Sequence, residues 1–224
     1  MEKLIDAISK NFGTVGLLSF LALLAILSTV RELARLRLDV ARQRSSDLLS
    51  RRFTAYGSLW SQMNELAIYS ATPFDERVAQ SLGERLSAWY FSAEGGMLLS
   101  ATARDFYFGL QHVLRKLSDV AIKPLPRKPE PQVEFREMLK SHSALSPSCV
   151  AAHNQGRPER MRGDHWLRLC DALADDVLSE LTKNPIRGSE LAFCVAQQVS
   201  SVLRSRLAFE VQSRLDPAPA WWRF

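Results

Sequence analysis

Residues 11–30 read NFGTVGLLSFLALLAILSTV, an uncharged run bounded by Lys10 and Arg31 that dominates the interpretation of this chain. A helix of about 20 residues rises roughly 30 Å, which matches the hydrocarbon thickness of a bilayer. The charges of residues 1–10 cancel, and no small-x-small cleavage site follows the run, which disfavours a cleaved signal peptide. A buried helix of a soluble core is the other alternative. The run predicts a transmembrane helix over residues 11–30 after a short N-terminal segment, residues 1–10.

Arginine is concentrated directly after this run. Residues 31–52 contain seven arginines and three acidic residues, so the window carries +4 of the chain's net charge of +5. Positively charged segments beside a membrane helix stay in the cytoplasm and attract anionic lipids. We therefore expect the N-terminus outside, the remaining domain in the cytoplasm, and the arginines on the membrane surface. The residues expected to contact the membrane surface are Arg31, Arg35, Arg37, Arg42 and Arg44.

An apolar stripe follows the arginines. Leu49, Phe53, Tyr56, Trp60 and Met63 are spaced alternately by four and three residues, which is the a/d pattern of a coiled coil. The pattern lasts under three heptads. It predicts either a helix that packs on its own domain or a helix that associates in parallel with a second copy.

The rest of the chain predicts helices. Apolar residues at helical spacing, with capping boxes at residues 72–75 and 102–105, indicate that residues 31–118 hold a juxtamembrane helix and a helical hairpin region. Residues 164–215 predict a C-terminal helical pair, with a turn near residues 184–188. Strand patterns are missing, so we expect an all-α fold: the transmembrane helix continuing into a cytoplasmic bundle of about five helices.

Two segments depart from this helical pattern. Residues 119–163 hold six of the ten prolines and predict a long Pro-rich linker with one short helix. Residues 216–224 form an aromatic tail with a Trp221-Trp222 pair. The tail is suited to the bilayer interface, to a partner's groove or to the domain's own core.

Motifs for common catalytic sites are missing. The chain has no phosphate-binding loop, no His-Glu-x-x-His, no Cys-x-x-Cys and no Gly-x-Ser-x-Gly. Gly95-Gly96 is interpreted as a helix C-cap. The cluster Trp89-Tyr90-Phe91 is interpreted as core packing at a helix end. Neither a cofactor nor a metal ion is expected.

Histidines, cysteines and acidic residues offer weaker candidates. Cys149 and His153, with His142 and His165, are possible zinc ligands with irregular spacing. The three cysteines are far apart, which fits a reducing compartment. An acidic stripe is expected to be solvated or to pair with arginines, and Arg204, Arg206 and Arg214 are the expected partners. The stripe consists of Asp171, Asp175, Asp176 and Glu180.

One stretch carries a resemblance. Residues 86–100, LSAWYFSAEGGMLLS, followed by residues 104–111, RDFYFGLQ, are similar to uncharacterised bacterial proteins with one N-terminal membrane helix and a helical remainder. The resemblance implies a bacterial source and an inner-membrane location, and it carries over no catalytic or binding residue.

These patterns predict a membrane-anchored cytoplasmic adaptor without enzymatic activity. Its expected partners are the lipid bilayer and a protein, either a different chain or a second copy. One alternative is a membrane-bound enzyme or toxic effector with an unrecognised site at the acidic stripe and the linker histidines. Another is a membrane-surface binder of nucleic acid, which the position of the arginines beside the predicted bilayer disfavours.

Overall fold

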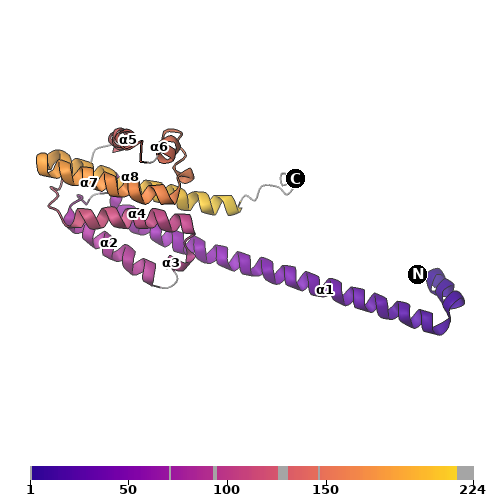
Figure 1. Cartoon of the computed structure of the whole chain (residues 1–224). Helices are drawn as coiled ribbons and strands as arrows, with labels where there is room; N and C mark the ends of the chain where they lie inside the picture. The colour runs from indigo at the N-terminus through magenta and orange to yellow at the C-terminus, as the bar shows by residue number, and fades with distance from the viewer. Residues whose placement is uncertain (1, 71, 93–94, 126–130, 146, 216–224) are drawn as a thin grey trace. The chain divides into compact units, whose positions relative to one another are not determined.

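The computed structural model describes the backbone of residues 2–70, 72–92, 95–125, 131–145 and 147–215 (Figure 1). It describes the side chains of the same ranges except at residues 2–18, 21, 25, 38–42, 44, 45, 131, 132, 159, 214 and 215. Each regular element in these ranges is helical, which confirms the predicted all-α class. The chain divides into two compact units, Met1–Arg51 and Arg52–Phe224.

Helix α1 (Glu2–Gln62) begins in the N-terminal unit and ends in the C-terminal unit. Among the described residues, no helix combines the length and the apolar character that crossing a bilayer requires. The predicted transmembrane run of residues 11–30 includes side chains outside the described set, at residues 11–18, 21 and 25. The transmembrane helix therefore stays a prediction.

The C-terminal unit is a bundle arranged around α4 (Ala101–Ser118). Three long helices, α2 (Glu76–Phe91), α7 (Gly163–Lys183) and α8 (Pro185–Leu215), pack against α4 (Figure 1). α7 and α8 also pack on each other as a hairpin, with only Asn184 between them. The end of α1 continues into the 3-10 helix η1 (Met63–Leu66), which contacts α8.

The burial pattern of α4 explains its central position. The sequence predicts one apolar face, with Phe106, Leu110, Val113 and Leu117, and all four side chains are buried. Tyr107 and Leu114 are buried as well, so α4 contacts neighbours over a wider arc than one stripe provides. A helix that is apolar over more than one face is stable only when other helices surround it.

The segment predicted as a Pro-rich linker is instead part of the bundle. It forms α5 (Pro131–Ser141), α6 (Pro147–Asn154) and η2 (Pro158–Arg160), and α5 and η2 pack on α8. Each of these elements starts with a proline, as does α8. Proline suits the first position of a helix, because the amide it lacks would have no partner there. Three of the six prolines interpreted as part of a linker, Pro131, Pro147 and Pro158, are therefore at helix starts.

The predicted helix starts are also displaced. The N-cap of α2 is Asp75, whose side chain accepts a hydrogen bond from the Val78 amide at 2.9 Å. The N-cap of α4 is Ser100, which accepts from the Ala103 amide at 3.0 Å. The capping boxes predicted at residues 72–75 and 102–105 are wrong in position, since Asp75 and Ser100 make the same kind of bond at the true starts.

Gly95 and Gly96 do not cap a helix. They open the short helix α3 (Gly95–Leu98), and both are buried. A Cβ on Gly96 would lie 2.8 Å from the Tyr90 carbonyl oxygen, and one on Gly95 would collide with the Trp89 backbone. The reason for glycine here is therefore the close approach of α3 to the end of α2.

Candidate interaction surfaces

The structure divides the predicted apolar stripe of α1 into two sets. Tyr56 and Met63 are buried in the C-terminal unit, with 4% and 0% of their surface exposed. Phe53 and Trp60 keep 56% and 44% exposed. Leu49, in the N-terminal unit, is half-buried. Packing of α1 on its own domain accounts for Tyr56 and Met63, and it leaves Phe53 and Trp60 available to a partner.

An apolar groove with a volume of about 370 Å³ lies between the end of α1 and α8. Phe53 and Trp60 are seven residues apart on α1, so their side chains lie on one face of the helix. The guanidinium carbon of Arg204 lies 5.7 Å from the centroid of the Trp60 ring and covers part of it. The groove is lined by Phe53, Tyr56, Gly57, Trp60, Leu207, Ala208, Val211 and Gln212.

A carboxylate beside the groove holds its two helices together. Glu210 of α8 accepts hydrogen bonds from the Tyr56 hydroxyl at 2.9 Å, from Ser100 Oγ at 2.5 Å and from Arg206 Nε at 3.0 Å. Burial, followed by the charge and the hydrogen bond of Glu210, raises the pKa of Tyr56 to about 12. These bonds fix α8 against α1 and the start of α4, so the groove is preformed.

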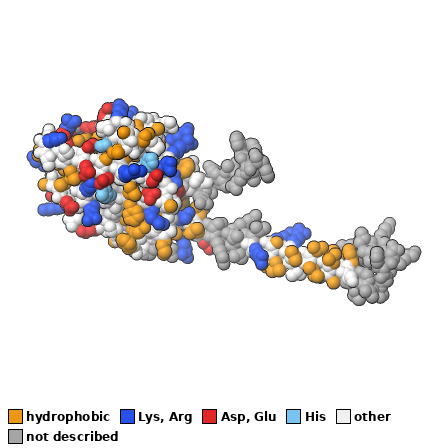
Figure 2. Space-filling view, viewed as in Figure 1, with side chains coloured by type: hydrophobic (Ala, Val, Ile, Leu, Met, Phe, Trp, Pro, Cys, Tyr) orange, Lys and Arg blue, Asp and Glu red, His pale blue; other side chains and the backbone are white. Residues whose placement is uncertain are grey.

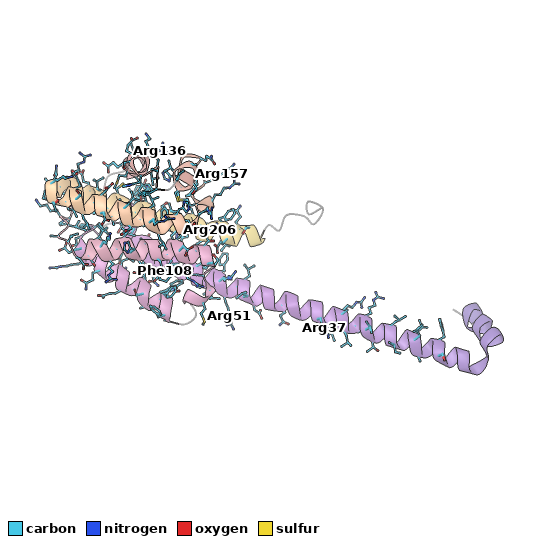
Figure 3. All side chains as sticks on the ribbon, in the orientation of Figure 1. Arg37, Arg51, Phe108, Arg136, Arg157 and Arg206 are labelled. Atoms are coloured by element: carbon cyan, nitrogen blue, oxygen red, sulfur yellow. The ribbon has the colours of Figure 1, made fainter. Side chains whose placement is uncertain are left out.

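The predicted membrane-surface arginines lie in the N-terminal unit. Arg31, Arg35 and Arg37 are exposed, and Figure 3 labels Arg37. Arg35 Nη1 pairs with Glu32 at 3.1 Å across one helical turn. The side chains of Arg42 and Arg44 lie outside the described residues.

The acidic stripe of α7 finds partners other than the expected arginines of α8. Lys116 Nζ donates to Asp171 at 2.5 Å and to Asp175 at 2.6 Å, and His112 Nε2 lies 2.7 Å from Asp171. Hydrogen bonds from Lys116 and then His112 lower the pKa of Asp171. Asp176 contacts His142 Nε2 at 2.7 Å.

The expected partners of the stripe have other contacts. Arg206 pairs with Glu210 on its own helix, and Arg204 lies over Trp60. The side chain of Arg214 lies outside the described residues. Both arginines extend from the half of α8 that lines the groove with α1, where Trp60 and Glu210 are their neighbours.

The candidate zinc ligands are dispersed. His142 contacts Asp176, His165 contacts Asp164 at 3.4 Å, and the His153 ring packs edge-on against Phe135. Within the described ranges, no three His, Cys, Asp or Glu side chains come together in a way that would hold a metal ion.

The buried thiols offer no evident nucleophile. Cys149, Cys170 and Cys194 are all buried as thiols. Burial raises the pKa of Cys170 well above its ordinary value, which keeps the thiol protonated at neutral pH. A cysteine of this kind behaves as a small apolar core residue.

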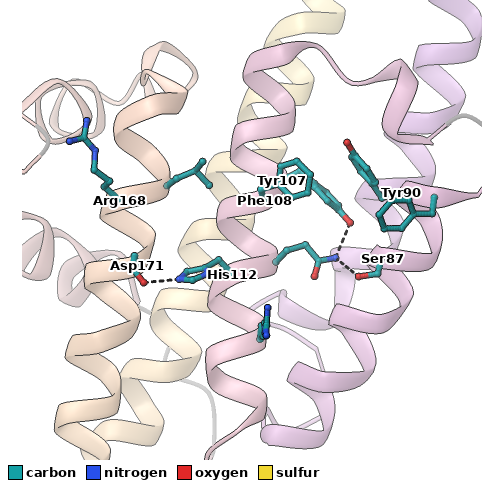
Figure 4. Close-up of a pocket in the computed structure, with 11 residues that line it drawn as sticks. Ser87, Tyr90, Tyr107, Phe108, His112, Arg168 and Asp171 are labelled. Atoms are coloured by element: carbon teal, nitrogen blue, oxygen red, sulfur yellow. Dashed lines mark hydrogen bonds and ion pairs between the residues drawn. The ribbon is translucent and has the colours of Figure 1, made fainter.

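A second hollow, which we call the aromatic cleft, runs over α4 between α2 and α7 (Figure 4). Its volume is about 630 Å³. Figure 2 shows apolar side chains gathered on this face of the C-terminal unit, with Lys and Arg side chains around them. The cleft is lined by Ser87, Tyr90, Phe91, Tyr107, Phe108, Gln111, His112, Arg115, Leu167, Arg168 and Asp171.

The sequence did not single out this cleft. The cluster Trp89-Tyr90-Phe91 was interpreted as core packing, but only Trp89, at 8% exposed, is buried. Tyr90 is half-buried and Phe91 is 85% exposed. Successive residues of a helix point about 100° apart, so three adjacent aromatics cannot share one face. This spacing around the helix could have predicted from the sequence that part of the cluster faces outward.

A hydrogen-bond network fixes one wall of the cleft. The Tyr107 hydroxyl donates to the Leu86 carbonyl at 2.8 Å, and Gln111 Nε2 donates to the Tyr107 hydroxyl at 2.8 Å. Gln111 Nε2 also lies 3.2 Å from the Gly83 carbonyl and 3.3 Å from Ser87 Oγ. The Tyr90 ring stacks on Tyr107, with centroids 5.0 Å apart and an interplanar angle of 19°. α2 and α4 are therefore joined along the cleft by both polar and aromatic contacts.

The chain matches no protein-family model, no curated protein and no solved structure. The resemblance of residues 86–111 to bacterial membrane proteins thus stays a prediction. The tail with Trp221-Trp222 lies outside the described residues.

Proposed function

We propose that this chain is a single-pass, membrane-anchored interaction protein whose cytoplasmic helical domain associates with a second copy through the α1–α8 groove. The observation that carries the proposal is the groove itself. Phe53 and Trp60 line this groove and are exposed, whereas Tyr56 and Met63, the other stripe residues of the same domain, are buried. Exposed apolar patches of this kind mark protein–protein contact sites.

Apolar exposure in the N-terminal unit supports the anchor. Leu23, Ile26, Leu27 and Val30 are between 54% and 60% exposed, within a run that has no charged residue between Lys10 and Arg31. Lipid would remove these side chains from water, and the exposed arginines that follow would stay at the headgroups. The same charge asymmetry favours a cytoplasmic position for the C-terminal unit.

Anchoring supports a second copy as the occupant of the groove. Two chains held in one bilayer by equivalent helices lie parallel and at high effective concentration. Tyr56 and Met63 are buried in the domain itself, so Phe53 and Trp60 are the stripe residues left to contact a parallel helix. Phe53 and Trp60, one heptad apart, would then meet the same residues of the other copy, which buries aromatic surface on both.

The test is fractionation followed by mass measurement of the full chain. We expect the protein in the membrane pellet after washing with high salt and alkaline carbonate. After extraction in mild detergent, light scattering should give a protein mass of two chains, twice 25.3 kDa. Phe53→Glu should give one chain, because the two charges would face each other in an apolar contact.

Tyr69→Glu provides the matched control. Tyr69 is 96% exposed and lies outside the groove, so the mass of this variant should stay at two chains. A single-chain mass for the wild type would exclude self-association. Release of the chain into the soluble fraction would exclude the anchor.

A further inference from the structure

The aromatic cleft exposes more apolar surface than the packing of its own helices explains. Phe91, Phe108 and Leu167 are 85%, 39% and 36% exposed, and they come from three different helices. Figure 3 labels Phe108 on α4. Clustered exposed apolar side chains on a folded domain indicate a surface that something else covers.

The floor of the cleft is buried and hydrogen-bonded. Tyr107, labelled in Figure 4, is 1% exposed, and its hydroxyl is held between the Leu86 carbonyl and Gln111. A site whose floor is ordered before binding requires little further ordering when a partner arrives. The cleft is therefore suited to binding and is not merely a packing defect at the helix ends.

The charges along the cleft favour an acidic partner. Among the described residues that line it, Asp171 is the one acidic residue, and it is paired with both Lys116 and His112. Arg115 and Arg168 also line the cleft and are exposed, and neither forms an ion pair with another residue of the described ranges. Two free guanidinium groups beside exposed aromatic rings match the residue types that dominate binding at protein interfaces.

We propose that the aromatic cleft binds an acidic segment of a partner protein. One apolar or aromatic side chain of the segment enters the cleft against Phe91, Phe108 and Leu167. Carboxylates beside it pair with Arg115 and Arg168, where guanidinium geometry allows two hydrogen bonds to each carboxylate.

A peptide fits the surroundings better than a polynucleotide. The described lining of the cleft offers two arginines without an ion pair, Arg115 and Arg168, which suits a short acidic segment, whereas a phosphate backbone needs a longer row of cations. Single-strand binding uses a continuous basic groove and free aromatic faces. Here the face of Tyr90 is already stacked on Tyr107.

The experiment is selection from a displayed library of random peptides on the purified full chain in detergent. We expect the selected peptides to carry Asp or Glu beside Phe, Leu or Trp. The affinity of a labelled selected peptide, measured by fluorescence anisotropy, should fall roughly tenfold or more in Arg168→Glu and in Arg115→Glu. It should also fall when the acidic residues of the peptide are replaced by Asn or Gln, and on addition of salt.

Two matched controls separate the cleft from general effects. Arg157→Glu changes an exposed arginine outside the cleft and should bind the peptide normally. Phe108→Ala should weaken binding, whereas Phe209→Ala, at a residue of similar exposure (41% against 39%), should not. Thermal unfolding followed by circular dichroism checks that each variant is folded.

The proposal is overturned if no acidic sequence is selected, or if selected peptides bind the two arginine variants as tightly as the wild type. It is also overturned if labelled DNA or RNA oligonucleotides, but no peptides, lose affinity in those variants. This proposal builds on the proposed interaction role but uses another face. Phe53→Glu should therefore keep peptide binding, and failure of one proposal is distinguishable from failure of the other.

Discussion

Two buried phenols show how single side chains connect the helices. Tyr56 joins α1 to Glu210 of α8, and Tyr107 joins α4 to the Leu86 carbonyl of α2. Burial is the largest cause that raises the pKa of each hydroxyl from 10.0 to about 12. In the folded protein both groups stay protonated at a pH where an unfolded chain would lose the proton.

Stability should therefore fall in strongly alkaline solution. Because the folded pKa is raised, the contribution is complete below pH 10.0 and is lost as the pH rises towards about 12. We expect a loss of about 1 kcal/mol per tyrosine by pH 11, from the difference in pKa. The free energy of unfolding at pH 8 and at pH 11 can be measured by chemical unfolding in detergent, monitored by circular dichroism.

Phenylalanine variants supply the comparison. Tyr107→Phe should have a lower free energy of unfolding than the wild type at neutral pH, because it lacks the hydrogen bond of the hydroxyl. This difference in the free energy of unfolding should narrow above pH 10, because phenylalanine has no hydroxyl proton to lose. Tyr69→Phe, at a 96% exposed position, should keep the wild-type pH dependence. If the wild type and Tyr107→Phe differ in free energy of unfolding by the same amount at pH 8 and pH 11, ionisation of Tyr107 does not contribute to the loss of stability.

At the scale of elements, the distances between helices are set by small residues that the helical pattern does not reveal. Phe106 stacks on Trp166 of α7 with ring centroids 5.1 Å apart. A Cβ on Gly109 would lie 2.5 Å from Trp166 Nε1 and 2.9 Å from Cys170 Sγ. Gly83 in α2 has its nearest neighbours at 3.8 and 3.9 Å, so it has room for a methyl group.

The two glycines should respond to alanine in opposite directions. Gly109→Ala should lower the free energy of unfolding by about 1–3 kcal/mol, since α7 must move away from α4. Gly83→Ala should raise it by up to about 1 kcal/mol, because alanine favours a helix interior and meets no close contact. Chemical unfolding of both variants in one detergent tests the pair. Stabilisation of both variants by the same amount would show that helix propensity, and not the contact with Trp166, decides.

At the scale of the whole C-terminal unit, the Pro-rich segment completes the core. Phe135 and Leu139 of α5 are 0% and 1% exposed, and Cys149 of α6 and Met161 are buried. α5 and η2 cover a side of α8 that α4 and α7 do not reach, and residues 192–200 of α8 are all buried. A linker would leave that side of α8 in water.

Truncation of one side chain in α5 tests this. Phe135→Ala should lower the free energy of unfolding by about 3–5 kcal/mol, as expected for a fully buried aromatic residue. Val133→Ala, two residues away and 55% exposed, should change it by less than about 0.5 kcal/mol. If both variants change the free energy of unfolding by a similar small amount, α5 is not part of the core and the segment is a linker.

The sequence alone determined the helical class and the approximate positions of the five long helices, because hydrophobic periodicity and chain breaks are local properties. It also indicated which residues of α1 form a stripe. Tertiary packing decided which of them face the core, namely Tyr56 and Met63, and which line a groove, namely Phe53 and Trp60.

The aromatic cleft depended entirely on tertiary structure. Its residues come from α2, α4 and α7, which are far apart in the sequence, and no spacing rule connects them. Likewise, a proline is a helix break or a helix start according to whether the residues after it find a surface to cover. Phe135 finds that surface on α8, and only the folded chain brings the two together.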